Sequence, residues 1–288
     1  LDFRGKGRLY DLLSRRSRRP RPAAANSEQS LRSISAGQFD VFHPTYFDPY
    51  FLEALGGRPF VVTVFDMIHE IFPEHLSLKD PASQWKRLLC EKASRIIAIS
   101  HATKMDLIEH FGVDPGKIDV VYLASSLGVT GEAAPARRPL ERRYVLFAGN
   151  REGYKNFFFF AGVVAEILVR STGLRLVCTG QPLSELERSF FERLSIAHLV
   201  EACPVSDNEL ARLYAGAEML IVPSLYEGFG MPILEAFACG CPVVLSDTPA
   251  LREIAGDAAL YFKPKSAAEL RAAIERLLGD NDLRATMT

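Results

Sequence analysis

The sequence predicts an α/β fold of two doubly wound domains that face a cleft, and three observations predict it. Short apolar runs alternate with helical patterns along the chain, an order typical of βαβ units. The apolar runs contain few alternating polar residues, as expected for strands of a parallel sheet that is covered on both faces. The length of 288 residues suits two domains of about 100–200 residues each.

Eight apolar runs, rich in Val, Ile, Leu and Phe, are the expected strands. They span residues 60–65, 95–100, 118–124, 143–149, 174–180, 218–223, 242–246 and 259–262. Between them, Ser-x-x-Glu patterns that begin at Ser184, Ser206 and Ser266 fit the capping box and predict helix starts. The Phe157–Phe160 run also begins a helix, and it favours core packing over a binding function.

A small, polar segment at residues 125–138 reads SSLGVTGEAAPARR and separates two αβ blocks. Its composition is typical of an interdomain linker. We therefore expect an amino-terminal domain over residues 1–125, a linker over 126–140 and a carboxyl-terminal domain over 141–288. In doubly wound domains, ligands bind outside the carboxyl ends of the strands.

The charge balance argues against a nucleic-acid binder that depends on global charge. Lys and Arg number 34 and Asp and Glu 35, which gives a net charge of −1. A local basic patch remains open, because Arg15, Arg16, Arg18, Arg19 and Arg21 fall within seven residues. This cluster is either a solvated loop or a surface for anionic lipid or a phosphorylated acceptor.

The five cysteines favour a reduced, cytoplasmic protein, because their odd number does not fit a disulfide framework. Cys239 and Cys241 lack a second Cys or His pair at ligand spacing, which favours core packing over a metal site. No run of 18 apolar residues exists, so the sequence predicts no transmembrane helix.

The most informative segment is PSLYEGFGMPILE at residues 223–235, where an apolar strand leads through a glycine-containing loop into a helix. Gly228 and Gly230 let the backbone approach a ligand closely, and the helix start favours an anion such as phosphate. Glu227 and Glu235 are placed to accept hydrogen bonds from hydroxyl groups of one ligand. Alternatively, Glu235 is an ordinary acidic residue near a helix start, and the residues alone do not decide between these readings.

The segment FAGNREGYKN at residues 147–156 also follows an expected strand and precedes a helix. Arg151 offers a planar guanidinium for phosphate oxygens, and Lys155 offers a point charge. Alternatively, Arg151 and Lys155 are solvated loop cations. The glycine-containing loop and the helix start beside them favour the phosphate-binding interpretation.

These segments carry a resemblance to a known family. Glu227 and Glu235 form a Glu-x7-Glu motif within EGFGMPILEAFACGCPVV, which resembles the signature of the retaining glycosyltransferases of group 1, also called family 4. That family has the GT-B fold of two Rossmann-like domains. The segment FAGNREGYKN resembles its diphosphate-binding loop, and the similarity extends roughly over residues 39–278.

The resemblance implies a nucleotide-diphosphate sugar as donor. Arg151 and Lys155 would neutralise the diphosphate, Glu227 would contact the sugar, Glu235 would hold the ribose hydroxyls, and the base would lie near Val205. The implied donor-binding set is Gly149, Asn150, Arg151, Lys155, Val205, Glu227, Gly228, Phe229, Gly230, Met231 and Glu235. The fold class usually works without a metal, so no metal and no cofactor are expected. The Asp280-Asn281-Asp282 sequence is expected to be a surface turn.

Two departures from the family pattern affect the acceptor side. Many relatives have a His-Asp pair where this chain has Phe65-Asp66, so a catalytic His is not carried over to position 65. Asp66 and His69 are the remaining catalytic candidates there, and His43 is a further acceptor-side candidate, although a lone His is more often structural. We also expect the first strand with its glycine-rich loop, and the last helix, to be missing from this chain.

The resemblance therefore implies retaining transfer of a hexosyl group from GDP-mannose or a UDP-sugar to a glycan or glycolipid hydroxyl, in surface polysaccharide biosynthesis. Two alternatives stay open: a nucleotide-sugar 2-epimerase of the same fold, and a non-catalytic donor-binding subunit. The expected location is the cytoplasm, with peripheral contact to the inner membrane face as a further hypothesis.

Overall fold

The computed structural model describes residues 22–75, 80–127, 142–151 and 153–287. The chain divides into two compact units. The smaller unit contains residues 1–63 and 81–96, and the larger unit contains residues 64–80 and 97–288. The predicted linker lies almost wholly outside the described residues, as does the arginine cluster at residues 15–21.

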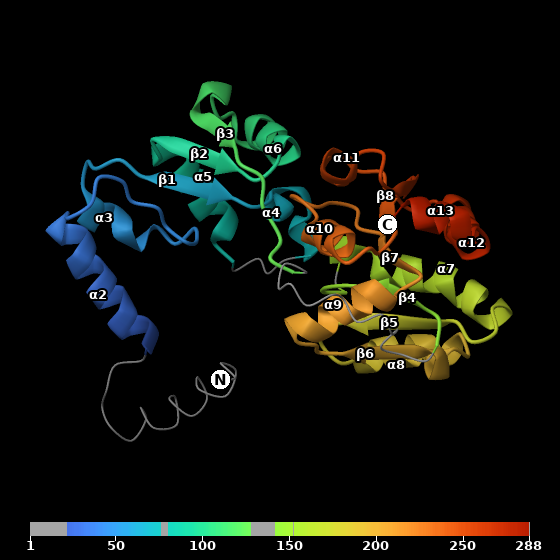
Figure 1. Ribbon diagram of the computed structural model, residues 1–288. Helices are drawn as coiled ribbons and strands as arrows, with labels where there is room; N and C mark the ends of the chain where they lie inside the picture. Colours follow the sequence, from blue (N-terminus) through green and yellow to red (C-terminus); the bar gives the residue numbers. More distant parts are fainter. Residues whose placement is uncertain (1–21, 76–79, 128–141, 152, 288) are drawn as a thin grey trace, which may run out of the picture. The chain divides into compact units, whose positions relative to one another are not determined.

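Strands and helices alternate along the chain (Figure 1). The strands are β1 (Val61–Val64), β2 (Arg95–Ala98), β3 (Ile118–Val120), β4 (Tyr144–Phe147), β5 (Arg175–Thr179), β6 (Val200–Cys203), β7 (Met219–Val222), β8 (Val243–Ser246) and β9 (Leu260–Phe262). The helices are α2 (Pro22–Ala36), α3 (Leu52–Leu55), α4 (Ile68–Ile71), α5 (Ala82–Lys92), α6 (His101–Phe111), α7 (Phe157–Arg170), α8 (Glu185–Arg193), α9 (Asp207–Gly216), α10 (Met231–Ala238), α11 (Pro249–Ala255), α12 (Ala267–Gly279) and α13 (Asn281–Thr286).

The larger sheet has the order β6-β5-β4-β7-β8-β9, and its strand pairs are parallel. Its first strand in the chain, β4, therefore lies in the middle. The chain builds outward from β4 through β5 and β6, then returns to add β7, β8 and β9 on the other side. This order has a topological switch point between β4 and β7, the place where α/β sheets bind ligands.

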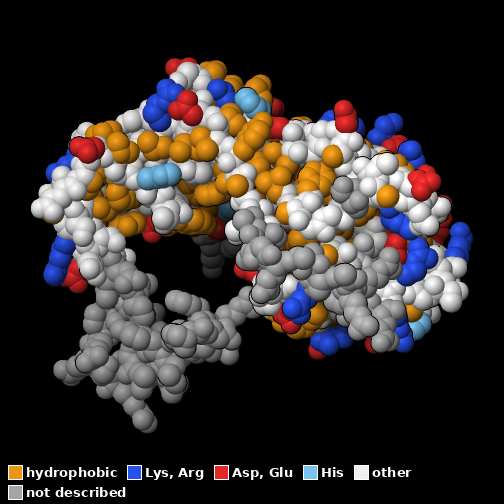
Figure 2. Space-filling view, in the orientation of Figure 1, with side chains coloured by type: hydrophobic (Ala, Val, Ile, Leu, Met, Phe, Trp, Pro, Cys, Tyr) orange, Lys and Arg blue, Asp and Glu red, His pale blue; other side chains and the backbone are white. Residues whose placement is uncertain are grey.

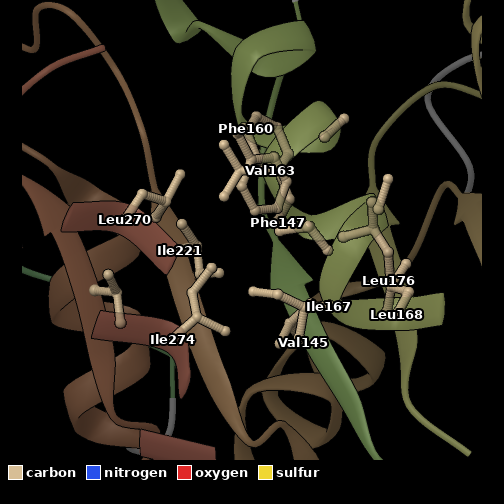
Figure 3. Packing of buried hydrophobic residues seen from close by; sticks show 14 of the residues in the cluster. Val145, Phe147, Phe160, Val163, Ile167, Leu168, Leu176, Ile221, Leu270 and Ile274 are labelled. Atoms are coloured by element: carbon tan, nitrogen blue, oxygen red, sulfur yellow. The ribbon is translucent and has the colours of Figure 1, made fainter. Parts of the chain in front are cut away.

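Two apolar cores cover the two faces of this sheet, because alternate residues of each strand point to opposite faces. On one face, Val145 and Ile221 pack against α7, α8 and α12 (Figure 3). On the other, Leu146 and Leu220 pack against α9, α10 and α11. The four residues of β4 are all buried, which explains why the strand sequence shows no polar alternation.

Each of the eight apolar runs contains a strand, although the strands are shorter than the runs. The prediction missed one strand, β6, which lies at the edge of the larger sheet. Its sequence is Val-Glu-Ala-Cys, and only Val200 is buried. An edge strand exposes more of its surface, so it lacks the continuous apolar run on which the prediction depended.

Two of the three predicted capping boxes are confirmed in full, at Ser184 before α8 and at Ser206 before α9. At the third, the Ser266 hydroxyl accepts from the Glu269 amide, but the Glu269 carboxylate accepts from the Lys263 amide instead of closing the box.

The smaller sheet has the order β1-β2-β3, and the division into units passes through it. Within the smaller unit, an aromatic cluster fills the core. The Phe51 ring is buried, and its centroid lies 4.7 Å from that of Phe42 and 5.4 Å from that of Phe60. Phe42 and Phe60 also form a parallel backbone bridge.

The described helices include none that is both long and apolar enough to cross a membrane. On the face drawn in Figure 2, acidic and basic side chains are interspersed over the described residues. This mixture agrees with the near-zero net charge.

The phenylalanine run at the start of α7 provides a test of the core. Phe160 is fully buried and stacks on Phe147 with ring centroids 5.6 Å apart, whereas Phe158 is 38% exposed. We expect Phe160→Ala to lower the free energy of unfolding by about 3–5 kcal/mol, because it leaves a cavity. Phe158→Ala is the matched control, with an expected loss below about 1 kcal/mol. Urea unfolding measures both, and equal losses would contradict the assignment of Phe160 to the core.

Candidate functional site

The loops after β4 and β7 meet at the switch point of the larger sheet. The Lys155 ammonium lies 2.7 Å from Oε1 of Glu227, and the Ser224 hydroxyl donates to the same oxygen over 2.7 Å. Both members of the ion pair are largely buried, with side chains 19% and 11% exposed. The pair therefore joins the two segments that the sequence marked as phosphate- and hydroxyl-binding.

Backbone contacts hold the same two loops together. The Leu225 amide donates to the Tyr154 carbonyl over 2.8 Å, and the Asn156 side-chain amide donates to the Pro223 carbonyl over 3.2 Å. Asn156 has a φ of 57°, in the left-handed region where Asn is more tolerated than most residues. This backbone turn leads the chain directly from Lys155 into α7.

The Arg151 side chain is buried and points into a protein network. Its Nε donates to Oε1 of Glu187 over 2.6 Å, and Nη2 donates to the carbonyls of Gln181 and Pro182 over 2.6 and 3.1 Å. Nη1 donates to the Thr179 carbonyl over 3.4 Å. The structure thus brings Lys155 and Glu227 together, while it engages the guanidinium of Arg151 with the segment that follows β5.

Glu187 serves two purposes. Its Oε2 accepts from the amide and hydroxyl of Ser184 and so closes the capping box of α8, while Oε1 accepts from Arg151. Burial acts to raise the pKa of Glu187, but the hydrogen bonds from Arg151 and Ser184 hold that pKa below its ordinary value. The carboxylate is therefore charged and fixes the loop after β4 to the start of α8.

Gly149 and Asn150 lie exposed at the end of β4. The Gly149 backbone has a φ of 115°, which side chains rarely allow, and its amide donates to the Thr179 hydroxyl. These residues line an open pocket of about 370 Å³, together with Arg151 and parts of residues 181–187.

The glycine turn after Glu227 is buried and tightly enclosed within the larger unit. A Cβ on Gly228 would lie 1.9 Å from the Phe65 carbonyl oxygen, so no side chain fits there. The Gly228 carbonyl accepts from the hydroxyls of Ser100 and Thr103 over 2.6 and 3.1 Å. Phe229 is also buried.

Gly230 precedes α10 with a φ of 109°, and Pro232 lies in the first turn as the sequence predicts. Met231 is the first residue of α10 and is partly exposed. The chain therefore reaches the start of α10 through a turn that only glycines can form.

Tyr226 anchors the other side of Glu227. Its hydroxyl donates to Oδ2 of Asp106 over 2.7 Å and accepts from the Met67 amide over 3.1 Å. Burial raises the pKa of Asp106 and of Tyr226, and the Asp106 carboxylate raises that of Tyr226 further. The phenol therefore stays protonated and keeps its bond to α6.

Glu235 lies one turn into α10, and its Oε2 accepts from the hydroxyl of Tyr214 over 2.8 Å. Val205, expected near the base, is partly exposed in the loop that follows β6.

The acceptor-side candidates lie in different surroundings. Asp66 lies against Gly228 and accepts from the Ile68 amide over 3.1 Å. His69 lies with its Nε2 3.5 Å from Oδ2 of Asp80. In the smaller unit, Nε2 of His43 lies 2.9 Å from the Thr63 hydroxyl.

Among the described residues, no group of three or more His, Cys, Asp or Glu is placed to hold a metal ion. Asp280 caps α13 by accepting from the Leu283 amide, so the Asp280–Asp282 segment begins a helix. Cys241 is buried, and burial raises the pKa of its thiol to about 12. Cys239, two residues earlier in the chain, is partly buried.

A doubly wound parallel sheet with charged side chains at its switch point is the arrangement of nucleotide-binding α/β proteins. Family profiles refine that class. One described as "Glycosyl transferases group 1" matches residues 142–280, and one described as "Glycosyltransferase Family 4" matches residues 5–124. The chain belongs to the group 1 glycosyltransferases.

Two curated relatives are named mannosyltransferases. An MMP α-(1→4)-mannosyltransferase from Mycolicibacterium hassiacum is 30% identical over 271 residues, which are 84% of this chain and 62% of the relative. The O-antigen chain mannosyltransferase B of Escherichia coli is 29% identical over 269 residues, with 86% of this chain and 68% of the relative covered. The chain thus spans about two thirds of the length of these relatives.

A solved structure shows the same fold. The Anabaena protein HepE in complex with UDP-glucose superposes with a TM-score of 0.74 at 20% identity, covering 91% of this chain and 74% of HepE. The fold of this chain is that of the GT-B glycosyltransferases, with parallel sheets flanked by helices in two Rossmann-like domains.

Three residues of the site were missed from the sequence: Glu187, Tyr226 and Tyr214. The sequence identified Glu187 only as part of a capping box, because the residue that contacts its Oε1, Arg151, lies 36 residues away in the chain. Tyr226 adjoins Glu227, which was a usable signal, but its partner Asp106 is 120 residues distant.

The enclosure of Gly228 predicts a severe effect of Gly228→Ala. We expect a loss of at least about 3 kcal/mol in the free energy of unfolding, because the Phe65 backbone must move. Gly162→Ala within α7 is the control, since an added Cβ there meets nothing within 4 Å. It should stabilise the chain by about 0.5–1 kcal/mol. A Gly228→Ala chain that unfolds at the wild-type urea midpoint would exclude the close contact in solution.

The Arg151–Glu187 pair predicts a pH-dependent stability. Because the folded chain lowers the pKa of Glu187 from 4.5, the charged carboxylate stabilises the fold above about pH 4.5 and loses this effect as the pH falls through the folded pKa. We expect Glu187→Gln to cost on the order of 3 kcal/mol at pH 7, with a smaller cost in acid. Urea unfolding across pH measures this, with exposed Glu185→Gln as control. A pH-independent cost would refute the charged pair.

Proposed function

We propose that this chain carries the donor site of an enzyme that transfers a hexosyl group from a nucleotide-diphosphate sugar to a hydroxyl of a glycan or glycolipid. The observation that carries the proposal is the Lys155–Glu227 pair at the switch point between β4 and β7. A cation for the diphosphate and a carboxylate for the sugar hydroxyls meet there, at the carboxyl ends of the strands of a doubly wound sheet.

The relatives support the choice of substrates. Two of them are named mannosyltransferases, one of these for the O-antigen chain, and a protein of the same fold was solved with UDP-glucose. We therefore propose GDP-mannose or a UDP-sugar as donor, and surface polysaccharide biosynthesis as the setting.

The ion pair explains how the site is prepared for the donor. Without a ligand, Glu227 compensates the charge of Lys155. When the donor binds, its diphosphate takes the ammonium, and the Glu227 carboxylate turns to the hydroxyls of the sugar. At the start of α10, the Met231 amide would add a further donor to the phosphate oxygens, since Pro232 has no N–H and the Ile233 amide donates to the Gly230 carbonyl.

Arg151 and Lys155 would contribute in different ways. The Lys155 ammonium is paired with Glu227 at the switch point. We propose that it contacts the diphosphate there and stabilises the charge that develops on the leaving group. Arg151 is engaged with Glu187 and the 181–182 carbonyls, so in this arrangement it would hold the 149–155 loop in the shape that presents Lys155.

The proposed stereochemical course is retention. The departing phosphate oxygen would accept the proton of the acceptor hydroxyl on the same face of the sugar, so the chain need not supply a general base. Asp66, which lies against the glycine turn, is the nearer acceptor-side candidate, and His69 is the second.

Function without a metal stays a prediction, as do the cytoplasmic location and the peripheral contact with a membrane. Lys155 and the start of α10 supply positive charge of the kind that a divalent cation would otherwise provide.

The test measures transfer and the roles of the two cations together. We expect release of the nucleoside diphosphate and formation of product only when donor and acceptor are both present. The NMR spectrum of the product should show the same anomeric configuration as that of the donor. Lys155→Ala should lower turnover by about a hundredfold or more, by analogy with the loss of one preorganised donor. Arg151→Ala should lower it to a similar extent, because a displaced 149–155 loop would misplace Lys155, and a misplacement of about 1 Å can cost about a hundredfold.

The control is Arg170→Ala, which removes an exposed cation from the opposite end of α7 and should leave turnover unchanged. Unchanged turnover in both active-site variants would reject the assignment. Conversion of the donor without any acceptor would indicate a 2-epimerase, and donor binding without either reaction would indicate a binding subunit.

A further inference from the structure

We infer that Tyr214 is a positioning residue that orients the Glu235 carboxylate toward the ribose of the donor and so gives the site its preference for ribonucleotides. The inference rests on the proposed function and adds a residue to it. Tyr214 lies on α9, and neither the glycine loops nor the Glu-x7-Glu motif includes it.

The contact joins a buried phenol to a partly exposed carboxylate. Tyr214 is 0% exposed within the core under α9 and α10, and its hydroxyl donates to Oε2 of Glu235 over 2.8 Å. Glu235 itself is only partly buried. The bond thus engages one oxygen of Glu235 from the core side, and the inference assigns the other oxygen to the ribose.

The helix that carries Tyr214 is itself fixed in place. The hydroxyl of Tyr144, which is also fully buried, donates to the carbonyl of Leu213 over 2.8 Å. Tyr144 is the first residue of β4, so the central strand sets the position of the last turn of α9. The next residue, Tyr214, then reaches α10 from a rigid support.

A carboxylate needs such a bond in order to read a vicinal diol. The terminal torsion of a glutamate side chain is broad, so an unsupported carboxylate rotates freely. Each carboxylate oxygen has two acceptor sites, so Glu235 can accept from Tyr214 and still accept from two ribose hydroxyls. With its plane fixed by Tyr214, Glu235 meets both hydroxyls without first losing rotational freedom.

The phenol is a dependable donor. Burial, and then the Glu235 carboxylate, raise the pKa of Tyr214 above its ordinary value, so the hydroxyl keeps its proton at neutral pH. An alternative role for the bond is purely structural, since a buried hydroxyl requires an acceptor. A purely structural bond would affect the stability of the fold, but it would not affect the preference of the site for ribose over 2′-deoxyribose.

The experiment compares ribose with deoxyribose. The full chain is titrated calorimetrically with GDP, UDP and their 2′-deoxy analogues. We expect the wild type to bind its preferred ribonucleotide about tenfold or more tightly than the 2′-deoxy analogue, the effect of a hydrogen bond to a charged group. Tyr214→Phe should reduce this ratio to about threefold or less, by weakening ribonucleotide binding and leaving deoxynucleotide binding unchanged.

Tyr261→Phe is the matched control, because it removes a tyrosine hydroxyl of the same unit that donates to the Gly256 carbonyl and contacts neither α9 nor Glu235 through that bond. It should keep the wild-type ratio. Tyr214→Met, which removes the hydroxyl with an apolar side chain of different shape, should lower the ratio as Tyr214→Phe does and covers the case that one variant folds poorly. In a Glu235→Ala chain, adding Tyr214→Phe should change the ratio no further.

The outcomes are separable. A wild type that binds neither GDP nor UDP rejects the proposed function, and this inference with it. A wild type that binds a ribonucleotide tightly while Tyr214→Phe keeps the full ribose preference rejects the inference alone. Equal losses of preference in Tyr214→Phe and Tyr261→Phe would also reject it, since the effect would then come from a general loss of stability.

Discussion

The site depends on one topological constraint, the change of direction at β4. From this strand the chain builds outward in one direction through β5 and β6, and later returns to place β7 on the other side. The helix after β4, α7, packs on one face of the sheet, and the helix after β7, α10, packs on the other. The two loops therefore meet at the end of the sheet and then lead to helices on opposite faces, and the Lys155–Glu227 pair joins them at this point.

Several carboxylates around the switch point accept hydrogen bonds from protein donors. Glu187 gives one oxygen to its helix cap and the other to Arg151. Oε1 of Glu227 accepts from both Lys155 and Ser224, and Oε2 of Glu235 accepts from Tyr214. At Glu227 and Glu235, a protein donor on one oxygen restricts the carboxylate and leaves the other oxygen for a ligand, at a smaller loss of side-chain freedom on binding.

The sequence predicts those features that depend on local pattern. Apolar runs predicted strands because buried parallel strands tolerate few polar residues, and this logic failed at β6, whose Glu201 and exposed Cys203 suit a sheet edge. The proximity of Lys155 and Glu227 was foreseeable, because both follow strands of one sheet. The direction of the Arg151 side chain was not, since it depends on carbonyls of Gln181 and Pro182 about 30 residues later. The same holds for Tyr214 and Tyr226, whose hydroxyl partners are set by the packing of helices.

On the proposed function, the ion pair also couples recognition of the phosphate to recognition of the sugar. A partly buried carboxylate that loses its cation must find other donors, because burial of an unpaired charge is costly. A nucleotide-diphosphate sugar supplies them, since it offers phosphate to Lys155 and hydroxyls to Glu227 at once. A nucleoside diphosphate supplies only the first and leaves Glu227 to compete for Lys155. The geometry therefore favours the intact donor over the product that remains after transfer, which eases product release without any change of fold.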